Sequence, residues 1–480
     1  MQTLDLAIII GFLVAMAGYG IWQGRSNRTT GDYFLGGRNL PWIVAMFSIV
    51  ATETSVLTFV SVPGIAYRGD WTFLQLALGY IFGRILVSAV LLPVYFREGV
   101  DSIYQVIGRR FGSSMQKLAS TVFLVTRILA DGVRFLATAV VVEVVTGWPL
   151  SVSVLIIGIV TLIYTLAGGI RTIVWIDSIQ FVLYLFGGII TIAFIAANLD
   201  TGLPEALGVL AEKGKMKIIN HDWRLFSEPW AFFSAFTGGI LLSFASHGVD
   251  YMMVQRVLGC KNLNAAKKAM IGSGIFVLLQ FMVFLLAGSL IYLFLGDVQV
   301  EKDREFASFI VNHLPVGLKG LLLAGVLSAA MSTLSSSINS LASSTVTDLL
   351  GGNASLNRSR LISLGWAAVL ISIALVFDES DSAIVVLGLK IASFTYGGLL
   401  GLFLLSGSGK HFHTWSLAAG LLAGMISVFA LEYTGIAWTW YIAFSVMVNI
   451  TVAWFVESLL PEKTRRSLNT GKPAWFKRRL

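Results

Sequence analysis

Long hydrophobic runs recur along the whole of this 480-residue chain, and they constrain its fold more than any other feature. Runs such as Leu4–Ile21, Val152–Leu166 and Ile275–Leu293 are, with their flanks, long enough to cross a bilayer as α-helices. Only 12% of the residues are charged, against about 25% in soluble globular proteins, which is too few to cover a water-facing surface of this size. The sequence therefore predicts an all-α membrane protein formed by a single polytopic domain over residues 1–480.

We expect about thirteen transmembrane helices, because about thirteen apolar stretches reach the length of roughly 20 residues that a span needs. The predicted spans are 4–23, 38–66, 72–96, 115–146, 149–168, 173–197, 229–256, 268–295, 312–349, 359–377, 382–406, 413–432 and 436–458. Several are too long for an upright helix, which predicts tilt or a break. In the long connection between the sixth and seventh spans, we expect a short amphipathic helix near Leu203–Glu212.

Basic residues gather in alternate connections between these spans and in the tail 459–480. The segments Arg25–Arg38, Arg97–Lys117 and Gln255–Lys268 are basic, whereas the intervening connections are not. Cytoplasmic loops carry an excess of Lys and Arg, so this pattern places the N-terminus outside and the C-terminus in the cytoplasm, as in a multi-pass protein of the inner (plasma) membrane. The net charge of +8 is thus explained by topology and does not indicate nucleic-acid binding.

The spans divide into a leading helix, two sets of five helices and two trailing helices. The leading helix is 4–23, the first set 38–197, the second set 229–406 and the trailing pair 413–458. Because five is odd, the second set crosses the membrane upside down relative to the first. This is the layout of an inverted-repeat transporter, in which substrate and ion sites lie near the midplane on broken helices.

The segment Ala51–Thr58 is the densest polar cluster in an apolar context. A carboxylate such as Glu53 costs about 2.5 kcal/mol or more near the centre of a membrane, which indicates a function; the alternative is a buried pair with a basic residue. If the helix unwinds here, its freed carbonyls are hard ligands that suit a small cation. We expect Pro63 and Gly64 to end the span rather than to form its break.

The ninth span carries a stripe of hydroxyl and amide side chains. At 3.6 residues per turn the stripe falls on one helix face, and it comprises Ser328, Ser332, Ser335, Ser336, Asn339 and Ser343. Small polar residues also serve close helix packing. Six oxygen-bearing side chains exceed what packing needs, so the pattern favours a face that lines an ion site.

Other charged residues lie within predicted spans. Asp177 is near the start of the sixth span, where a first-turn acid favoured by the helix dipole is the alternative to a functional role. Arg127, Asp131 and Arg134 have helical spacing for ion pairs. We interpret them, with Arg84, first as a structural network and second as a source of one arginine for an anionic substrate.

Motifs for catalysis are missing from the sequence. His247 and Asp250 lie in the seventh span, and a single histidine of this kind more often forms hydrogen bonds than binds a metal. The chain has neither zinc-ligand spacing, nor a phosphate-binding glycine loop, nor a nucleophile elbow, so nothing in it supports an enzyme. Its single cysteine, Cys260, excludes an internal disulfide.

Several motifs together resemble the sodium:solute symporter family, which includes sodium/glucose, sodium/proline and sialic acid symporters. They are Asp32–Gly37, Ala51–Gly64, Tyr164–Ile170 with Trp175–Asp177, Gln255-Arg256 and Ala329–Ser340, and the likeness extends over nearly the whole chain. The resemblance implies a LeuT-like fold and sodium as the coupling ion, without an organic cofactor.

The resemblance also implies site residues. For the main sodium site it implies the backbone carbonyls of Ala51, Thr54 and Ala329 with the hydroxyls of Ser332 and Thr333. For a second sodium site, which only some members have, the matching residues are Asp177, Ser332, Ser335 and Ser336. By position, the residues expected to contact the substrate are Glu53, Ser55, Thr58, Gln75, Ser243, Ser246 and His247.

The sequence thus predicts a sodium-driven symporter of a small polar solute that works by alternating access. A sugar, a carboxylate and an amino acid all remain open as the substrate, and the oligomeric state is open too. The nearest rival keeps the fold but couples to protons through Glu53 or Asp177. A solute sensor and a channel are further alternatives; scattered ionisable residues, which form no ring, argue against the channel.

Overall fold

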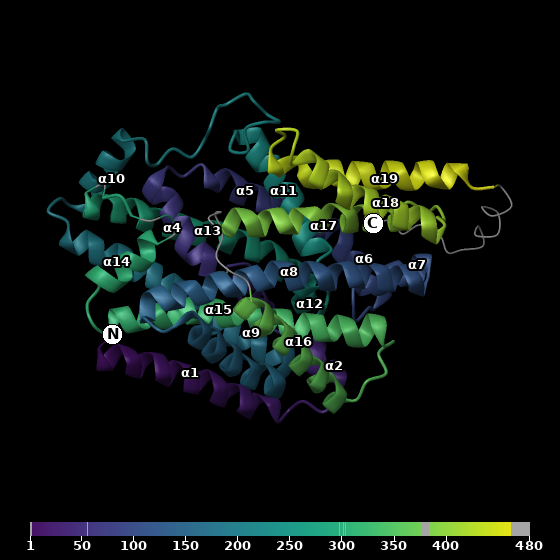
Figure 1. The fold of residues 1–480 in the computed structure, drawn as a ribbon, viewed down its shortest axis with the longest axis horizontal. Coiled ribbons are helices and arrows are strands. Elements are labelled where there is room, and N and C mark those ends of the chain that lie inside the picture. The colour runs from purple at the N-terminus through teal and green to yellow at the C-terminus, as the bar shows by residue number, and fades with distance from the viewer. Residues whose placement is uncertain are drawn as a thin grey trace.

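The computed structural model describes residues 2–54, 56–296, 298–300, 302, 304–376 and 384–461. Within these ranges the regular structure is helical, and one isolated bridge joins Leu40 to Cys260. The long helices run side by side along the horizontal axis of Figure 1, with α10 and α14 at one end of the bundle and α2 and α7 at the other. The α-helices are α1 (Thr3–Gly24), α2 (Thr30–Leu35), α3 (Trp42–Glu53), α4 (Val56–Arg68), α5 (Phe73–Leu86), α6 (Leu92–Glu98), α7 (Tyr104–Phe111), α8 (Ser113–Thr146), α9 (Leu150–Asn198), α10 (Leu203–Glu212), α11 (Phe232–Gly248), α12 (Tyr251–Leu258), α13 (Leu263–Leu295), α14 (Glu305–His313), α15 (Leu318–Ser344), α16 (Leu356–Val376), α17 (Ile384–Gly407), α18 (Thr414–Leu431) and α19 (Tyr441–Leu459).

Eight helical segments in the described part of the chain are long and apolar enough to cross a membrane. They contain α1, α5 with α6, α9, α13, α15, α16, α18 and α19. Two further pairs pass the same test when each pair is taken as one span: α3 with α4, bent by 62°, and α11 with α12, bent by 63°. The prediction of an all-helical membrane protein is therefore confirmed.

The predicted fifth and sixth spans, 149–168 and 173–197, form one helical segment, α9, with a kink between them. Gly169 takes φ +61° and ψ −163° at this kink. A Cβ atom there would lie 2.5 Å from the carbonyl oxygen of Tyr33, so the close approach of α2 requires glycine. The kink lets one stretch of 49 residues serve as two differently directed helices.

Two local expectations have clear outcomes. The helix expected in the long connection is α10, and its bounds are those predicted, Leu203–Glu212. The expectation that Pro63 and Gly64 end the span is wrong, because both lie inside α4, which continues to Arg68. The Pro63 carbonyl lies against Gly288 of α13, where an added Cβ would be 2.0 Å from the oxygen. The Pro-Gly pair thus marks a close approach of α4 and α13 rather than a helix end.

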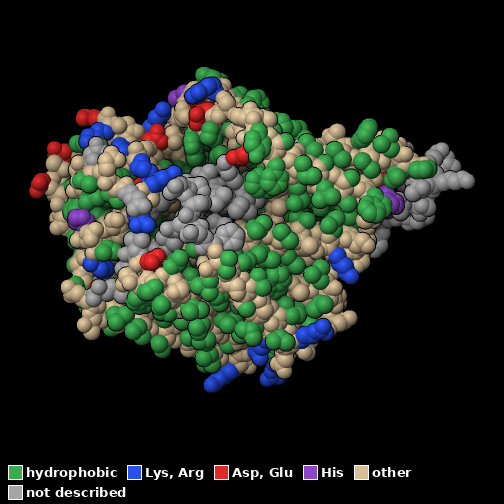
Figure 2. Space-filling model, viewed as in Figure 1, with side chains coloured by type: hydrophobic (Ala, Val, Ile, Leu, Met, Phe, Trp, Pro, Cys, Tyr) green, Lys and Arg blue, Asp and Glu red, His purple; other side chains and the backbone are tan. Residues whose placement is uncertain are grey.

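The outer surface of the bundle is apolar where the spans lie. In Figure 2 hydrophobic side chains are spread over the lower and right-hand parts of the face shown, and acidic side chains lie in the half that carries α10 and α14. In α8, Val125 and Leu129 are 50% and 48% exposed, although both are apolar. A surface of this kind is favourable in contact with lipid rather than water.

The ninth predicted span is the buried centre of the bundle. It corresponds to α15, which packs against α9, α8 and α1 and also contacts both halves of the broken pair α3 and α4. Its polar face, from Ser328 to Ser343, is at most 6% exposed. The fold therefore places the serine-rich stripe next to the first helix break.

Candidate functional site

The first helix break falls inside the polar segment that the sequence singled out. α3 ends at Glu53, and the backbone of Thr54 has left the helical region, with φ −81° and ψ 85°. Thr54 still donates its N–H to the carbonyl of Val50 at 2.9 Å. The last turn of a helix leaves carbonyls without an intrahelical partner, so this break supplies oxygen ligands in the interior of the bundle.

The residues expected for the main sodium site lie on the two elements that meet at this break. Ala51 and Thr54 are at the end of α3, and Ala329, Ser332 and Thr333 are on α15; all five are at most 6% exposed. The Thr54 hydroxyl exchanges hydrogen bonds of 2.8 and 3.0 Å with the amide of Gln280 in α13. The Thr333 hydroxyl donates to the Ala329 carbonyl at 3.4 Å.

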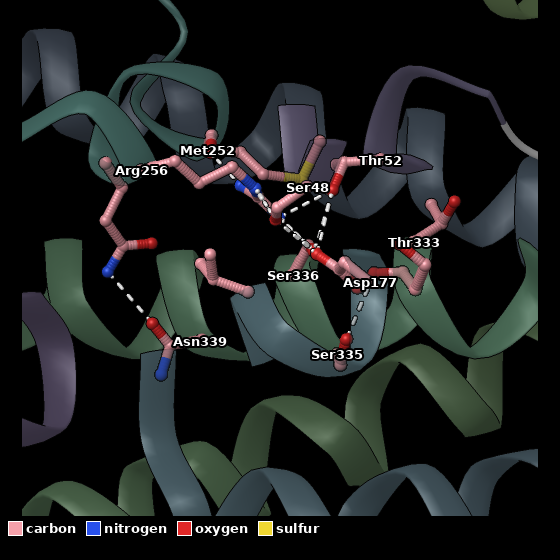
Figure 3. Close-up of polar contacts among 12 residues, drawn as sticks. Ser48, Thr52, Asp177, Met252, Arg256, Thr333, Ser335, Ser336 and Asn339 are labelled. Carbon is pink, nitrogen blue, oxygen red and sulfur yellow. Dashed lines mark hydrogen bonds and ion pairs between the residues drawn. The ribbon is translucent and has the colours of Figure 1, made fainter. Parts of the chain in front are cut away.

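A second cluster surrounds the carboxylate of Asp177, as Figure 3 shows. Ser48 donates to its Oδ2 at 2.6 Å, and Thr52 lies 3.4 Å from the same oxygen. Ser336 of α15 is 3.2 Å from the Thr52 hydroxyl, so α3, α9 and α15 are joined through polar side chains. Asp177 lies eight positions after the kink at Gly169, more than two turns into the helix that follows, so the explanation of Asp177 as a first-turn acid does not apply.

Arg256 of α12 completes this cluster, and the sequence reasoning did not assign it to the site. Its guanidinium donates to Ser48 at 2.8 Å and to Thr52 at 2.6 Å, and it also contacts Ser336. Its Nη2 lies 3.4 Å from Oδ2 of Asp177, and both side chains are 0% exposed. The signal in the sequence was a basic residue inside an apolar segment, where a buried cation needs a partner.

Two oxygens of the predicted second sodium set have no hydrogen-bond partner within the described residues. They are Oδ1 of Asp177 and Oγ of Ser332, and both are buried. Ser335 is engaged differently, because its hydroxyl donates to the Ser332 carbonyl at 3.0 Å. Buried polar atoms are nearly always satisfied, so an unpaired carboxylate oxygen beside an unpaired hydroxyl marks a place that suits a small hard cation.

Glu53 is paired with a basic residue, as one of the two sequence interpretations required. Its Oε2 accepts from Arg84 of α5 and lies 3.5 Å from Nε2 of His247 in α11. Arg84 also donates to Ser273 at 2.6 Å, and His247 is bonded through Nδ1 to Ser246 at 2.9 Å. Glu53 and His247 thus lie together although 194 positions separate them in the chain.

The other residues expected to contact the substrate are dispersed. Ser243 donates to the carbonyl of Tyr80, four positions before Arg84 in α5, at 3.0 Å. Thr58 is half-buried on α4, and Ser55 lies outside the described residues.

Gln75 is bound elsewhere, in contacts with the long connection before α11. Its side chain donates to the carbonyl of Trp230 and accepts from the N–H of Asn220, each at 3.0 Å. These contacts tie α5 to that connection.

The predicted ion pairs of α8 are present. Arg127 lies 3.3 Å from Asp131 and 3.4 Å from Asp250, and Arg134 lies 3.9 Å from Asp131. Arg127 also donates to the hydroxyl of Tyr396 in α17 at 2.8 Å. Asp250 is the N-cap of α12 and accepts from the N–H of Met252 at 2.9 Å, so this network joins α8 to the second helix break.

The family of the chain follows from its sequence match. The model of the sodium:solute symporter family matches residues 33–427, which include both helix breaks and the buried face of α15. The chain belongs to the sodium:solute symporter family. The family and the relatives below are transporters, which agrees with the absence of catalytic motifs from the sequence.

Curated members of the sodium:solute symporter family match most of the chain. The human sodium/iodide cotransporter is 28% identical over 88% of this chain and 68% of its own length. The sodium/sialic acid symporter of Proteus mirabilis is 25% identical over 90% of each chain. The mouse sodium-coupled monocarboxylate transporter 2 is 27% identical over 90% of this chain and 72% of its own.

Solved structures of symporters share the fold. A substrate-bound, outward-open sodium-coupled sialic acid symporter aligns with a TM-score of 0.86 at 23% identity, covering 96% of this chain and 98% of that one. The nucleobase-cation symporter Mhp1 in an inward-facing conformation aligns with a TM-score of 0.54 at 14% identity, covering 90% and 94%. The helix arrangement is therefore that of known symporters.

Proposed function

We propose that this member of the sodium:solute symporter family couples the inward movement of sodium to the uptake of a small polar solute by alternating access. The observation that carries the proposal is the buried oxygen cluster between the break after α3, the interior of α9 and the polar face of α15. In that cluster Oδ1 of Asp177 and Oγ of Ser332 have no hydrogen-bond partner among the residues that the structure describes. The named relatives move iodide, sialic acid or monocarboxylates together with sodium, which supports sodium as the coupling ion here.

For the main sodium ion we propose the carbonyls of Ala51, Thr54 and Ala329 and the hydroxyls of Ser332 and Thr333. Support comes from the contact of α15 with both α3 and α4, because the proposed ligands lie on α15 and at the end of α3. An ion held there links the break of the first broken span to α15, and it would therefore stabilise the arrangement in which these helices meet.

For a second sodium ion we propose Asp177, Ser332, Ser335 and Ser336. Arg256 already contacts Asp177 and Ser336, so the guanidinium and the ion compete for the same carboxylate. Competition of this kind would couple sodium binding to a movement of α12, because the ion would weaken the contacts of Arg256 with α9 and α15.

We further propose about thirteen spans arranged as a LeuT-like five-plus-five inverted repeat, with α1 leading and α18 and α19 trailing. The two bent pairs support it, because α3 with α4 and α11 with α12 are the opening spans of the two predicted sets. The likeness to symporters of this architecture supports it independently.

We propose that the N-terminus is outside and that the C-terminal tail is in the cytoplasm, with the protein in the inner (plasma) membrane. The basic connections that contain α2 and α7 lie at one end of the bundle, and α10 and α14 lie at the other (Figure 1). The positive-inside rule assigns the α2 and α7 end to the cytoplasm. Sodium then enters down its gradient with the membrane potential, which contributes about 2.3 kcal/mol per charge per 100 mV.

The test is transport by the purified chain in proteoliposomes. A thermal-shift screen of small solutes in sodium chloride first finds a ligand, because a ligand of the folded state raises its apparent stability. Uptake of that ligand is then measured at fixed pH with an inward gradient of sodium or of choline. We expect accumulation with sodium only; equal accumulation with choline would refute the proposal. Accumulation driven by a proton gradient without sodium would favour the proton-coupled alternative.

A further inference from the structure

Two side chains of opposite charge are partly open to space within the helix bundle. The side chain of Glu53, where α3 ends, is 18% exposed, whereas its partners Arg84 and His247 are 0% and 2% exposed. The side chain of Arg134 in α8 is 17% exposed, whereas its neighbour Asp131 is 2% exposed. At these two places a charge is accessible while the groups that balance it are covered.

The exposed part of Arg134 faces the interior of the bundle rather than the lipid. Val125, which is 50% exposed, marks the outer face of α8. Arg134 is nine positions further along, which is about two and a half turns at about 3.6 residues per turn, so it lies on the opposite face. Arg127 is one heptad before Arg134, on the same face, and is only 1% exposed.

Neither charge is fully used by the contacts that surround it. Both contacts of Glu53 described above use Oε2, so among the described residues Oε1 remains able to accept hydrogen bonds from another molecule. Asp131, the acid nearest to Arg134 at 3.9 Å, is closer to Arg127, at 3.3 Å, and also accepts from Ser337. Nη1 of Arg134 has no hydrogen-bond partner within the described residues.

The two charges act on the same region. His247 lies 3.5 Å from Glu53 and three positions before Asp250, and Asp250 lies 3.4 Å from Arg127 on the same face of α8 as Arg134. Ion pairs thus connect the end of α3, where Glu53 lies, through α11 and the second helix break to the inner face of α8, which carries Arg134.

We propose that the solute of this symporter is a small zwitterion of the amino-acid type, with its ammonium group on Glu53 and its carboxylate on Arg134. The inference rests on the proposed symport function and specifies its substrate class. A zwitterion satisfies both charges in a site of low polarity and carries no net charge into it. A monoanion would meet only Arg134 and would face the like charge of Glu53, and a sugar would leave both charges without a charged partner.

The first experiment compares solute classes on the full-length protein in detergent. The probes are the twenty common L-amino acids, β-alanine and γ-aminobutyrate, tested against propionate, iodide and galactose. We expect at least one zwitterion to raise the melting temperature in sodium chloride but not in choline chloride. For that zwitterion, the amine that lacks its carboxylate and the acid that lacks its ammonium should each bind about tenfold or more weakly.

The second experiment removes one charge at a time. Arg134→Gln should bind the amine, which lacks the carboxylate, as tightly as the amino acid. It should still bind the amino acid more tightly than the acid, which lacks the ammonium group. Glu53→Gln should bind the acid as tightly as the amino acid, and it should still bind the amino acid more tightly than the amine. Arg224→Gln, at a surface position that is 69% exposed, is the matched control and should retain both preferences. The sodium-dependent rise in melting temperature of each variant shows that it is folded.

The outcomes separate the substrate class from the transport function. Sodium-driven uptake of propionate, iodide or galactose, with no amino acid bound, would overturn the zwitterion and leave the symporter standing. If each variant weakened the binding of the amine and of the acid equally, Glu53 and Arg134 would only support the fold. This result would also overturn the assignment. If sodium were required neither for the binding nor for the uptake of any probe, both proposals would be overturned.

Discussion

The guanidinium of Arg256 and the carboxylate of Asp177 lie 3.4 Å apart, and both side chains are completely buried. Arg256 belongs to the second broken span and Asp177 to α9, so the pair joins elements that are 79 positions apart. Buried ion pairs are costly to break from one side, because the remaining charge loses its partner. The pair therefore offers a direct way to probe the proposed sodium site.

Replacing Arg256 tests whether sodium and the guanidinium share one carboxylate. In Arg256→Gln, Asp177 keeps its charge without the arginine, so we expect the protein in choline chloride to lose about 3–5 kcal/mol of stability. Sodium should then raise the melting temperature more than in wild type, because the ion has no competitor. A sodium effect no larger than that of wild type would contradict the shared site.

Asp177→Asn removes the charge itself. We expect weaker activation of uptake by sodium, with a half-maximal concentration about tenfold higher, because charge-assisted contacts contribute about 1.5–3 kcal/mol. The double variant Asp177→Asn with Arg256→Gln leaves neither charge buried alone and controls for folding. If the sodium titration of the double variant matched wild type, Asp177 would not be a sodium ligand.

Ser332→Ala tests the hydroxyl that has no partner within the described residues. Because this hydroxyl makes no hydrogen bond within that part of the chain, its removal should change stability in choline little and should raise the sodium concentration needed for half-maximal transport. Ser340→Ala is the matched control on the same helix, since that hydroxyl is already bonded to the Ser337 carbonyl at 3.2 Å. An unaltered titration for Ser332→Ala, or an equal change in both variants, would count against the assignment.

The carboxylate of Asp5 in α1 caps α15 at its N-terminal end. It accepts from the N–H groups of Gly317 and Gly320 at 2.8 and 2.9 Å. We expect Asp5→Ala to lower stability by about 1–2 kcal/mol, the usual cost of losing an acidic cap, and thermal unfolding in detergent measures it. Asp200→Ala, at an exposed position, should change stability by less than about 0.5 kcal/mol; an equal loss in both would argue against the cap.

Close backbone packing of α5 on α11 depends on Gly239. An added Cβ would lie 2.2 Å from the carbonyl oxygen of Leu76, so Gly239→Ala should force the helices apart and cost about 1–3 kcal/mol. Gly18→Ala in α1 places its methyl group in open space and should be neutral or slightly stabilising. If Gly239→Ala and Gly18→Ala lowered the melting temperature equally, the close contact of α5 with α11 at Gly239 would not contribute to stability.

Helical spacing allowed some contacts to be predicted before the structure. The pairs Arg127 with Asp131 and Asp131 with Arg134 are separated by one turn of one helix, so their proximity follows from local geometry. The polar face of α15 follows from the same periodicity. The pairing of Glu53 with Arg84, the place of Gln75 beside Trp230 and the role of Arg256 do not, because each depends on how separate helices are rotated and packed.

The sequence by itself determined that the chain is a helical membrane protein, where its apolar segments lie and which segment is rich in polar groups at the first break. These are local properties, since hydrophobic length and helical period are written into consecutive residues. Only the tertiary structure decided which buried charges meet. A buried charge without a partner is energetically unfavourable. Its partner comes from a neighbouring helix, and the packing of the bundle decides which helix that is.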